Sequence, residues 1–186
     1  MANLNQQDEF IAFRESCIWL QNCFNTFQSL YASGPETESA LRRTASLFFG
    51  DLNKILQEYF FLQARKITDP TISFKRENLT VNNINEGLVR SGLMTQEISA
   101  LSDSIHLYRE TISEFSNRVV AHADKYTALN AVLVGEHSNI ELESFMSNVR
   151  AYTDAVGITL GVGPLDYRSQ AGSGDALDLI RSLKRA

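Results

Sequence analysis

Residues 10–31 read FIAFRESCIWLQNCFNTFQSLY, and this stretch decides the fold class. Large apolar residues recur along it at every third or fourth position: Phe10, Phe13, Cys17, Leu20, Phe24, Phe27 and Tyr31. This spacing places a continuous apolar stripe on one face of an α-helix. A stripe this rich in aromatic residues must be covered by other elements. The sequence therefore predicts a long first helix that packs into a core made by several helices.

A second long helix is predicted between Ser33 and Asp69-Pro70, where proline stops helix growth. Its apolar stripe consists of Leu41, Ala45, Phe48, Leu52, Ile55, Tyr59 and either Leu62 or Ala64. Further apolar residues stand beside this stripe, so the helix is apolar around more than half of its circumference and is expected to be the central element. Ser33-Gly-Pro-Glu36 matches a capping box, so we expect Ser33 to cap the helix.

Helical patterns continue to the end of the chain. They predict a short helix from Thr80 to Gly92, a long helix from Thr95, a helix from Ser138 to Gly161 and a short final helix around residues 177–183. The glycine-rich residues 161–174 indicate a loop, and no stretch clearly predicts a strand. We predict an all-α antiparallel bundle of about five to six helices, forming one domain over residues 1–186 that includes a C-terminal loop and short helix at about 161–186.

The composition narrows the classes of function. A formal net charge of −5 disfavours a general nucleic-acid-binding surface, so any RNA contact must use a local patch. Cys17 and Cys23 stand six residues apart on a predicted helix, and no Cys/His cluster has the spacing of a zinc site. We expect no metal and no cofactor. No apolar run reaches membrane-spanning length and the first nine residues lack a secretion pattern, so a cytoplasmic location is expected.

One segment carries residues that could do chemistry: SNRVVAHADK, residues 116–125. On a helix, Arg118 and His122 are four residues apart and share a face. An imidazole beside a guanidinium can bind an anion or transfer a proton. The same pattern also fits a structural role, in which His122 is a half-buried residue bonded to a backbone carbonyl or to Asp124. The residues alone leave both interpretations open.

The phrase Asn-Arg-x-x-Ala-His-x-Asp-Lys resembles the motif of HEPN proteins, specifically the abortive-infection-U type. Members of that type tend to read Arg-Asn-Lys-x-x-Ala-His-x-Asp. Residues 56–69 are similar to the family's second helix, residues 79–88 to its short connecting helix and residues 172–183 to its closing helix. The resemblance therefore covers nearly the whole chain.

This resemblance implies a helical bundle that dimerises through the motif helix and cuts RNA without a metal ion, in a toxin–antitoxin pair or in phage defence. It implies that His122 is the general acid/base and that Arg118 stabilises charge on the phosphate. Asn117 would orient one of these groups, whereas Ser116, Asp124 and Lys125 would contribute to substrate binding. The implied partners are a second copy of the chain, an RNA substrate and an antitoxin.

The chain departs from the family pattern at two positions. Ser116 stands where the family has its arginine, and Arg118 stands where the family usually has lysine. Serine carries no charge and cannot form a bidentate contact with a phosphate. Two expectations follow. Either Arg118 replaces the missing arginine, or catalysis is lost and the protein is a helical interaction module.

Overall fold

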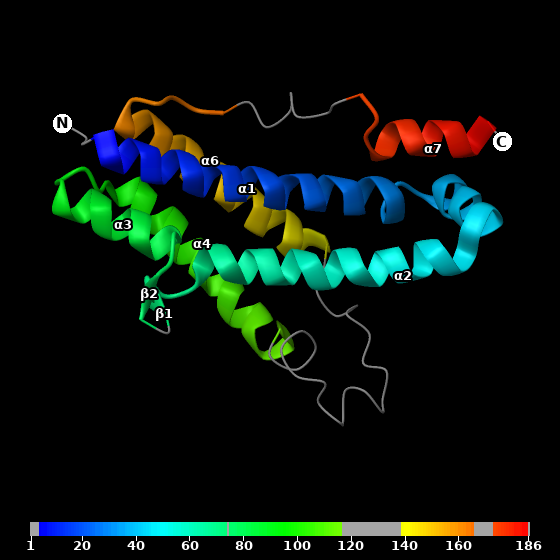
Figure 1. Ribbon diagram of the computed structural model, residues 1–186, viewed down its shortest axis with the longest axis horizontal. Coiled ribbons are helices and arrows are strands. Elements are labelled where there is room, and N and C mark those ends of the chain that lie inside the picture. The colour runs from blue at the N-terminus through cyan, green and yellow to red at the C-terminus, as the bar shows by residue number, and fades with distance from the viewer. Residues whose placement is uncertain (1–3, 74, 117–138, 166–172, 186) are drawn as a thin grey trace.

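The computed structural model describes residues 4–73, 75–116, 139–165 and 173–185, and these residues form six helices and a small β-hairpin (Figure 1). The elements are α1 (Leu4–Tyr31), α2 (Pro35–Thr68), β1 (Ile72–Ser73), β2 (Arg76–Glu77), α3 (Val81–Arg90), α4 (Gln96–Ser116), α6 (Asn139–Leu160) and α7 (Ala176–Arg185). The predicted all-α bundle is confirmed. No described helix is both long and apolar enough to cross a membrane.

The long helices α1 and α2 form an antiparallel hairpin that runs through most of the length of the molecule (Figure 1). Helix α6 packs on α1, α4 packs on α2, and α4 and α6 pack on each other. This second pair covers one half of the hairpin. The other half, which includes the turn between α1 and α2, is contacted by α7 (Figure 1).

The main core lies between α1, α2, α3, α4 and α6. The predicted stripe of α1 is confirmed there, because Phe10, Phe13, Cys17 and Leu20 are completely buried. Tyr152 joins α6 to α1 and α3. Its ring meets the edge of Phe13 at a centroid distance of 6.2 Å, and its hydroxyl donates a hydrogen bond of 2.8 Å to Oδ1 of Asn85 in α3.

A smaller core lies at the other end of the hairpin. It contains Leu30 of α1, Leu41 and Phe49 of α2, and Ile180 of α7. The predicted final helix is thereby confirmed, and its apolar face has a clear function in packing. Lys184, in its last turn, forms an ion pair with Glu36 in the first turn of α2 at 3.4 Å. Helix α7 therefore covers the end of the α1–α2 hairpin that contains the turn.

The predicted apolar stripe of α2 is buried only in part, since Leu41 is buried and Ala45 and Leu52 pack against the smaller core. Phe48 and Ile55, which belong to the predicted buried stripe, are 61 % and 58 % exposed. The face that packs is instead turned toward Phe49, Phe60, Phe61, Ala64 and Ile67, all of which are buried. Because α2 is apolar around most of its circumference, periodicity alone does not determine which side faces the core.

The predicted cap at Ser33 is also wrong. The N-cap of α2 is Gly34, whose φ of 93° is in the region that favours glycine, and no side chain caps this end. The hydroxyl of Ser33 instead donates to the carbonyl oxygen of Gln28 in α1 at 3.1 Å. Ser33 therefore completes the end of the first helix rather than the start of the second.

Other predicted boundaries are confirmed. The hydroxyl of Thr80 accepts a hydrogen bond from the backbone N–H of Asn83 and caps α3. Gly92 and Gly161 follow α3 and α6 with positive φ angles of 68° and 77°. The cap predicted at Ser138 lies outside the described residues. The antiparallel β1–β2 hairpin was not predicted, because strands of two residues are too short to show an alternating pattern.

Candidate functional site

The motif predicted from the sequence begins at the C-terminal end of α4. Ser116 is the last described residue of this helix, and only its backbone is described. Asn117, Arg118, His122, Asp124 and Lys125 lie outside the described residues. The structure therefore does not place the predicted site residues relative to one another. It does show how the helix that leads into the motif is held in the bundle.

Helix α4 is fixed by a regular buried face. Ile98, Ile105 and Tyr108 of its predicted stripe are buried against α2 and α6. The ring of Tyr108 stacks on that of Phe145 of α6 at a centroid distance of 4.3 Å and an interplanar angle of 25°. Burial, and secondarily the charge of Glu141, raises the pKa of Tyr108, so the phenol stays neutral. This stacking orders α4 about two turns before the motif.

A charged cluster joins α4 to the end of α2. The Nη2 atom of Arg109 lies 3.4 Å from Oδ1 of Asp69, and Nε of Arg65 lies 3.9 Å from the same oxygen. All three side chains are about one-third exposed. Asn82 of α3 donates to the backbone carbonyl of Asp69 at 3.3 Å and helps to fix this turn. One carboxylate thus holds two guanidinium groups at the junction of α2, α3 and α4.

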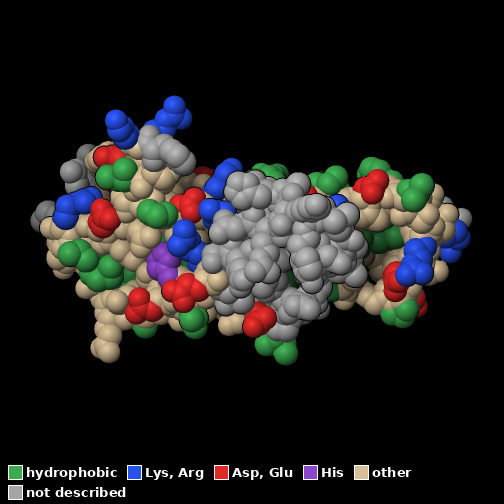
Figure 2. All heavy atoms as spheres, turned by 90° about the horizontal axis from the view of Figure 1, so that it is seen from below, with side chains coloured by type: hydrophobic (Ala, Val, Ile, Leu, Met, Phe, Trp, Pro, Cys, Tyr) green, Lys and Arg blue, Asp and Glu red, His purple; other side chains and the backbone are tan. Residues whose placement is uncertain are grey.

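His106 stands three residues before Arg109 on the same helix and is half-buried. Its pKa is lowered, first by burial and then by the charge of Arg109, against smaller opposing effects of Asp103 and Glu110. Nε2 of this imidazole has no hydrogen-bond partner among the described residues. The ring is therefore neutral near pH 7. Figure 2 shows this side of the molecule, with a histidine among basic and acidic side chains.

Sequence reasoning did not select His106, Arg109 or Asp69 for a site. The spacing of three residues between His106 and Arg109 was a usable signal, because it places both on neighbouring positions of a helix. The contact with Asp69 had no such signal, because it spans 40 residues and depends on how α4 crosses α2. Among the described residues, no group of three His, Cys, Asp or Glu side chains is arranged to hold a metal ion.

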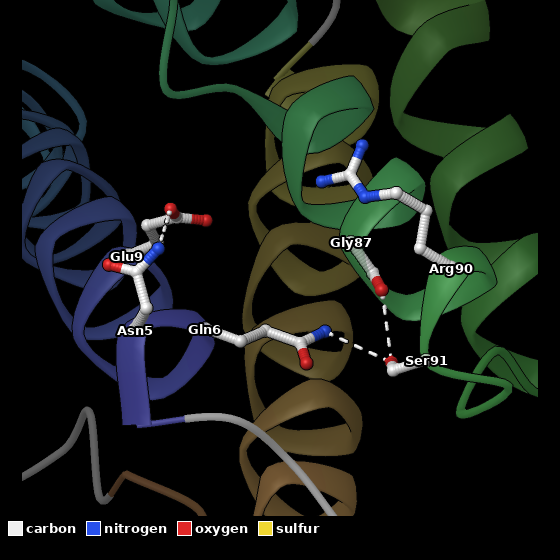
Figure 3. A pocket seen from close by; sticks show the side chains of 6 residues that line it. All are labelled: Asn5, Gln6, Glu9, Gly87, Arg90 and Ser91. Atoms are coloured by element: carbon white, nitrogen blue, oxygen red, sulfur yellow. Dashed lines mark hydrogen bonds between the residues drawn. The ribbon is translucent and has the colours of Figure 1, made fainter.

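A polar hollow of about 230 Å³ lies between the start of α1 and the end of α3 (Figure 3). Its lining consists of Asn5, Gln6, Glu9, Gly87, Arg90 and Ser91. Gln6 donates to Ser91 at 3.3 Å, Asn5 donates to Glu9 at 2.9 Å, and Ser91 donates to the carbonyl of Gly87 at 2.9 Å. These hydrogen bonds satisfy many of the polar groups that line the hollow. The bond between Gln6 and Ser91 joins α1 to α3. We interpret the hollow as a structural contact.

The described residues form an α-helical bundle in which the anchored helix α4 ends at Ser116, where the predicted motif begins. The family model for the AbiU2 type of HEPN domain matches residues 5–179. The chain therefore belongs to this abortive-infection family. Comparison with curated proteins and with solved structures found no match.

Proposed function

We propose that the protein is a metal-independent endoribonuclease that acts as a homodimer in a bacterial defence or toxin–antitoxin system. The observation that supports this most strongly is the combination of family membership over residues 5–179 with the Asn117-Arg118…Ala121-His122 phrase in the expected part of the chain. The anchoring of α4 by Tyr108 and Arg109 adds support, because catalytic groups need a rigid helix to hold their geometry.

The proposed chemistry uses the residues of the motif alone. The imidazole of His122 accepts a proton from the ribose 2′-hydroxyl or donates one to the leaving 5′-oxygen. The guanidinium of Arg118 stabilises the negative charge that develops on the phosphate as the new P–O bond forms and the old one breaks. Asn117 orients one of these two groups, while Ser116, Asp124 and Lys125 contact the substrate. A dimer through the motif helix would pool basic side chains that a chain of net charge −5 otherwise lacks.

A second function, a non-catalytic interaction module, is favoured by one specific observation. Ser116 occupies the position of the family's arginine and offers no cation to a phosphate. In this alternative the protein keeps the dimer, and His122 is a structural residue in the interface. A natural partner would be an antitoxin protein.

Induced expression in a bacterial host separates the two functions. The wild type is compared with His122→Ala and Arg118→Ala, and total RNA from each culture is run on a gel. For the nuclease we expect growth arrest and cleaved RNA in the wild type, and both effects lost in each variant at equal protein levels. Cleavage by purified protein in the presence of EDTA tests metal independence. Cleavage that persists in His122→Ala would contradict the proposed role of that residue, and absence of cleavage in the wild type would favour the interaction module.

A further inference from the structure

One face of the α1–α2 hairpin exposes a row of large apolar side chains. Phe48 and Ile55 of α2 are 61 % and 58 % exposed, and Trp19 of α1, which contacts Tyr59 of α2, is 51 % exposed. No described helix covers this face of the hairpin, because α4 and α6 pack on its other side (Figure 1). Exposed apolar residues are ordinary when scattered, but a continuous row is typical of a contact surface.

The row follows one straight line along α2. Phe48, Ile55, Tyr59 and Leu62 share one side of α2 at spacings of seven, four and three residues, which is the kind of spacing by which two helices pack along a seam. Leu52, which stands between Phe48 and Ile55, packs against the smaller core instead. We call Phe48, Ile55, Tyr59 and Leu62, together with Trp19, the α2 seam. It starts after Ala45, whose φ of −162° and ψ of 75° interrupt α2, and it continues for roughly 21 Å of regular helix.

Trp19 and Tyr59 give the seam a fixed aromatic centre. The indole N–H of Trp19 donates to the hydroxyl of Tyr59 at 2.9 Å, and the two rings meet edge to face at a centroid distance of 6.5 Å. The two polar groups therefore bond to each other, while about half of Trp19 remains exposed. Tryptophan and tyrosine held in this way are the side chains that most often anchor protein interfaces.

We propose that the α2 seam binds the α2 seam of a second copy of this chain, with the two helices antiparallel. The positions support self-association, because in an antiparallel pair centred on Ile55 the Phe48 of one copy lies opposite the Leu62 of the other. The same row therefore faces itself across a two-fold axis near Ile55. The border of the seam carries both signs of charge, Asp51 and Glu58 with Lys54 between them, rather than one block that would repel a copy.

The exposed area fits such a dimer. Half or more of Trp19, Phe48 and Ile55, with the smaller exposed parts of Tyr59 and Leu62, amounts to roughly 400 Å² of apolar surface on typical side-chain areas. A stable interface buries about 800 Å² per partner, of which a little over half is apolar. The α2 seam thus supplies most of the apolar part, and the neighbouring polar side chains supply the rim.

This contact is separate from the proposed dimer through the motif helix, because the seam lies on α1 and α2 and the motif begins at the end of α4. Sedimentation velocity of the full chain tests it. We expect Phe48→Glu/Ile55→Glu to halve the mass of the assembly, from tetramer to dimer if the motif dimer also forms, or from dimer to monomer if it does not. Ile158→Glu, at an α6 residue that is 63 % exposed, is the matched control and should leave the mass unchanged.

Cysteine cross-linking tests the antiparallel arrangement directly. Ile55→Cys places a thiol near the proposed two-fold axis, so oxidation with copper phenanthroline should give a dimer band on a non-reducing gel. Ile158→Cys should give none, and the native Cys17 and Cys23 are buried. Circular dichroism of each variant verifies that it is folded. A wild type that is monomeric, a mass that the seam variant does not change, or cross-linking no stronger for Ile55→Cys than for Ile158→Cys would each overturn the proposal.

Discussion

The Nη2 atom of Arg109 in α4 lies 3.4 Å from the Oδ1 atom of Asp69, the residue that follows α2. This pair joins the two helices about two turns before Ser116, where the predicted motif begins. Both side chains are about one-third exposed, so water weakens the attraction without removing it. The pair therefore helps to set where the helix that carries the motif leaves the bundle.

Replacing Asp69 tests the strength of this connection. We expect Asp69→Ala to lower the free energy of unfolding by about 1 kcal/mol or less, because the pair is partly solvated. Arg109→Ala should have a similar effect, and the double variant should cost less than the sum of the two. Urea unfolding measures all four proteins. Glu38→Ala, which removes the well-exposed pair with Arg42, is the control and should change stability very little. Strictly additive effects of the Asp69 and Arg109 substitutions would show that the pair does not couple the helices.

Two helical glycines should respond to alanine in opposite directions. A Cβ atom on Gly157 of α6 would collide with the carbonyl oxygen of Gly163, whose position is fixed because the N–H of Gly163 donates to the carbonyl of Gly157 at 3.0 Å. We expect Gly157→Ala to destabilise the protein by about 1–3 kcal/mol. A Cβ on Gly50 of α2 meets nothing within 4 Å, so Gly50→Ala should stabilise by about 0.5–1 kcal/mol through helix propensity. Thermal unfolding of the two variants measures the difference, and equal shifts would contradict the close approach at Gly157.

The lowered pKa of His106 predicts a loss of stability in mild acid. Burial and the charge of Arg109 keep this imidazole neutral in the folded chain, whereas the unfolded chain takes up a proton near the ordinary histidine pKa of 6.5. The unfolded state therefore binds more protons, and stability falls as pH decreases from about 6.5 toward the lower folded pKa. We expect His106→Gln to show a shallower fall over this range, because His122 and His137 are present in both proteins and cancel in the comparison. Urea titrations at several pH values measure this, and parallel profiles would exclude His106 as the cause.

Most of the fold was predictable because its helices carry one-sided patterns. The buried stripe of α1, the N-cap at Thr80 and the end of α6 at Gly161 are each determined by residues that are close together in the sequence. Helix α2 was predicted as an element, but its orientation was not. Phe48 and Phe49 are adjacent and equally apolar, and the packing of α1 and α7 decides that Phe49 is the buried one.

The candidate site was predicted by a resemblance in residues 116–125, which the family comparison supports for the chain as a whole. The contacts that hold the preceding helix were not predictable in the same way. Asp69 and Arg109 are far apart in the sequence, and Tyr108 stacks on Phe145 across a boundary between two helices. Such contacts depend on the crossing of helices, which a periodic pattern in one segment does not define.

Ser116 offers the sharpest test of what the site does. If the missing cation is what limits catalysis, Ser116→Arg should restore the family's arginine and increase RNA cleavage by at least about tenfold, because a guanidinium can pair bidentately with a phosphate and serine cannot. Ser116→Lys is the matched control. It restores charge without the planar fork, so we expect a smaller gain. Initial rates of cleavage on one defined RNA measure all three proteins, with His122→Ala added to Ser116→Arg to verify that the gain needs the motif histidine. If Arg118 already fills the role, Ser116→Arg will leave the rate unchanged or lower it by repulsion between two neighbouring cations, and Arg118→Ala will abolish cleavage in the Ser116 background.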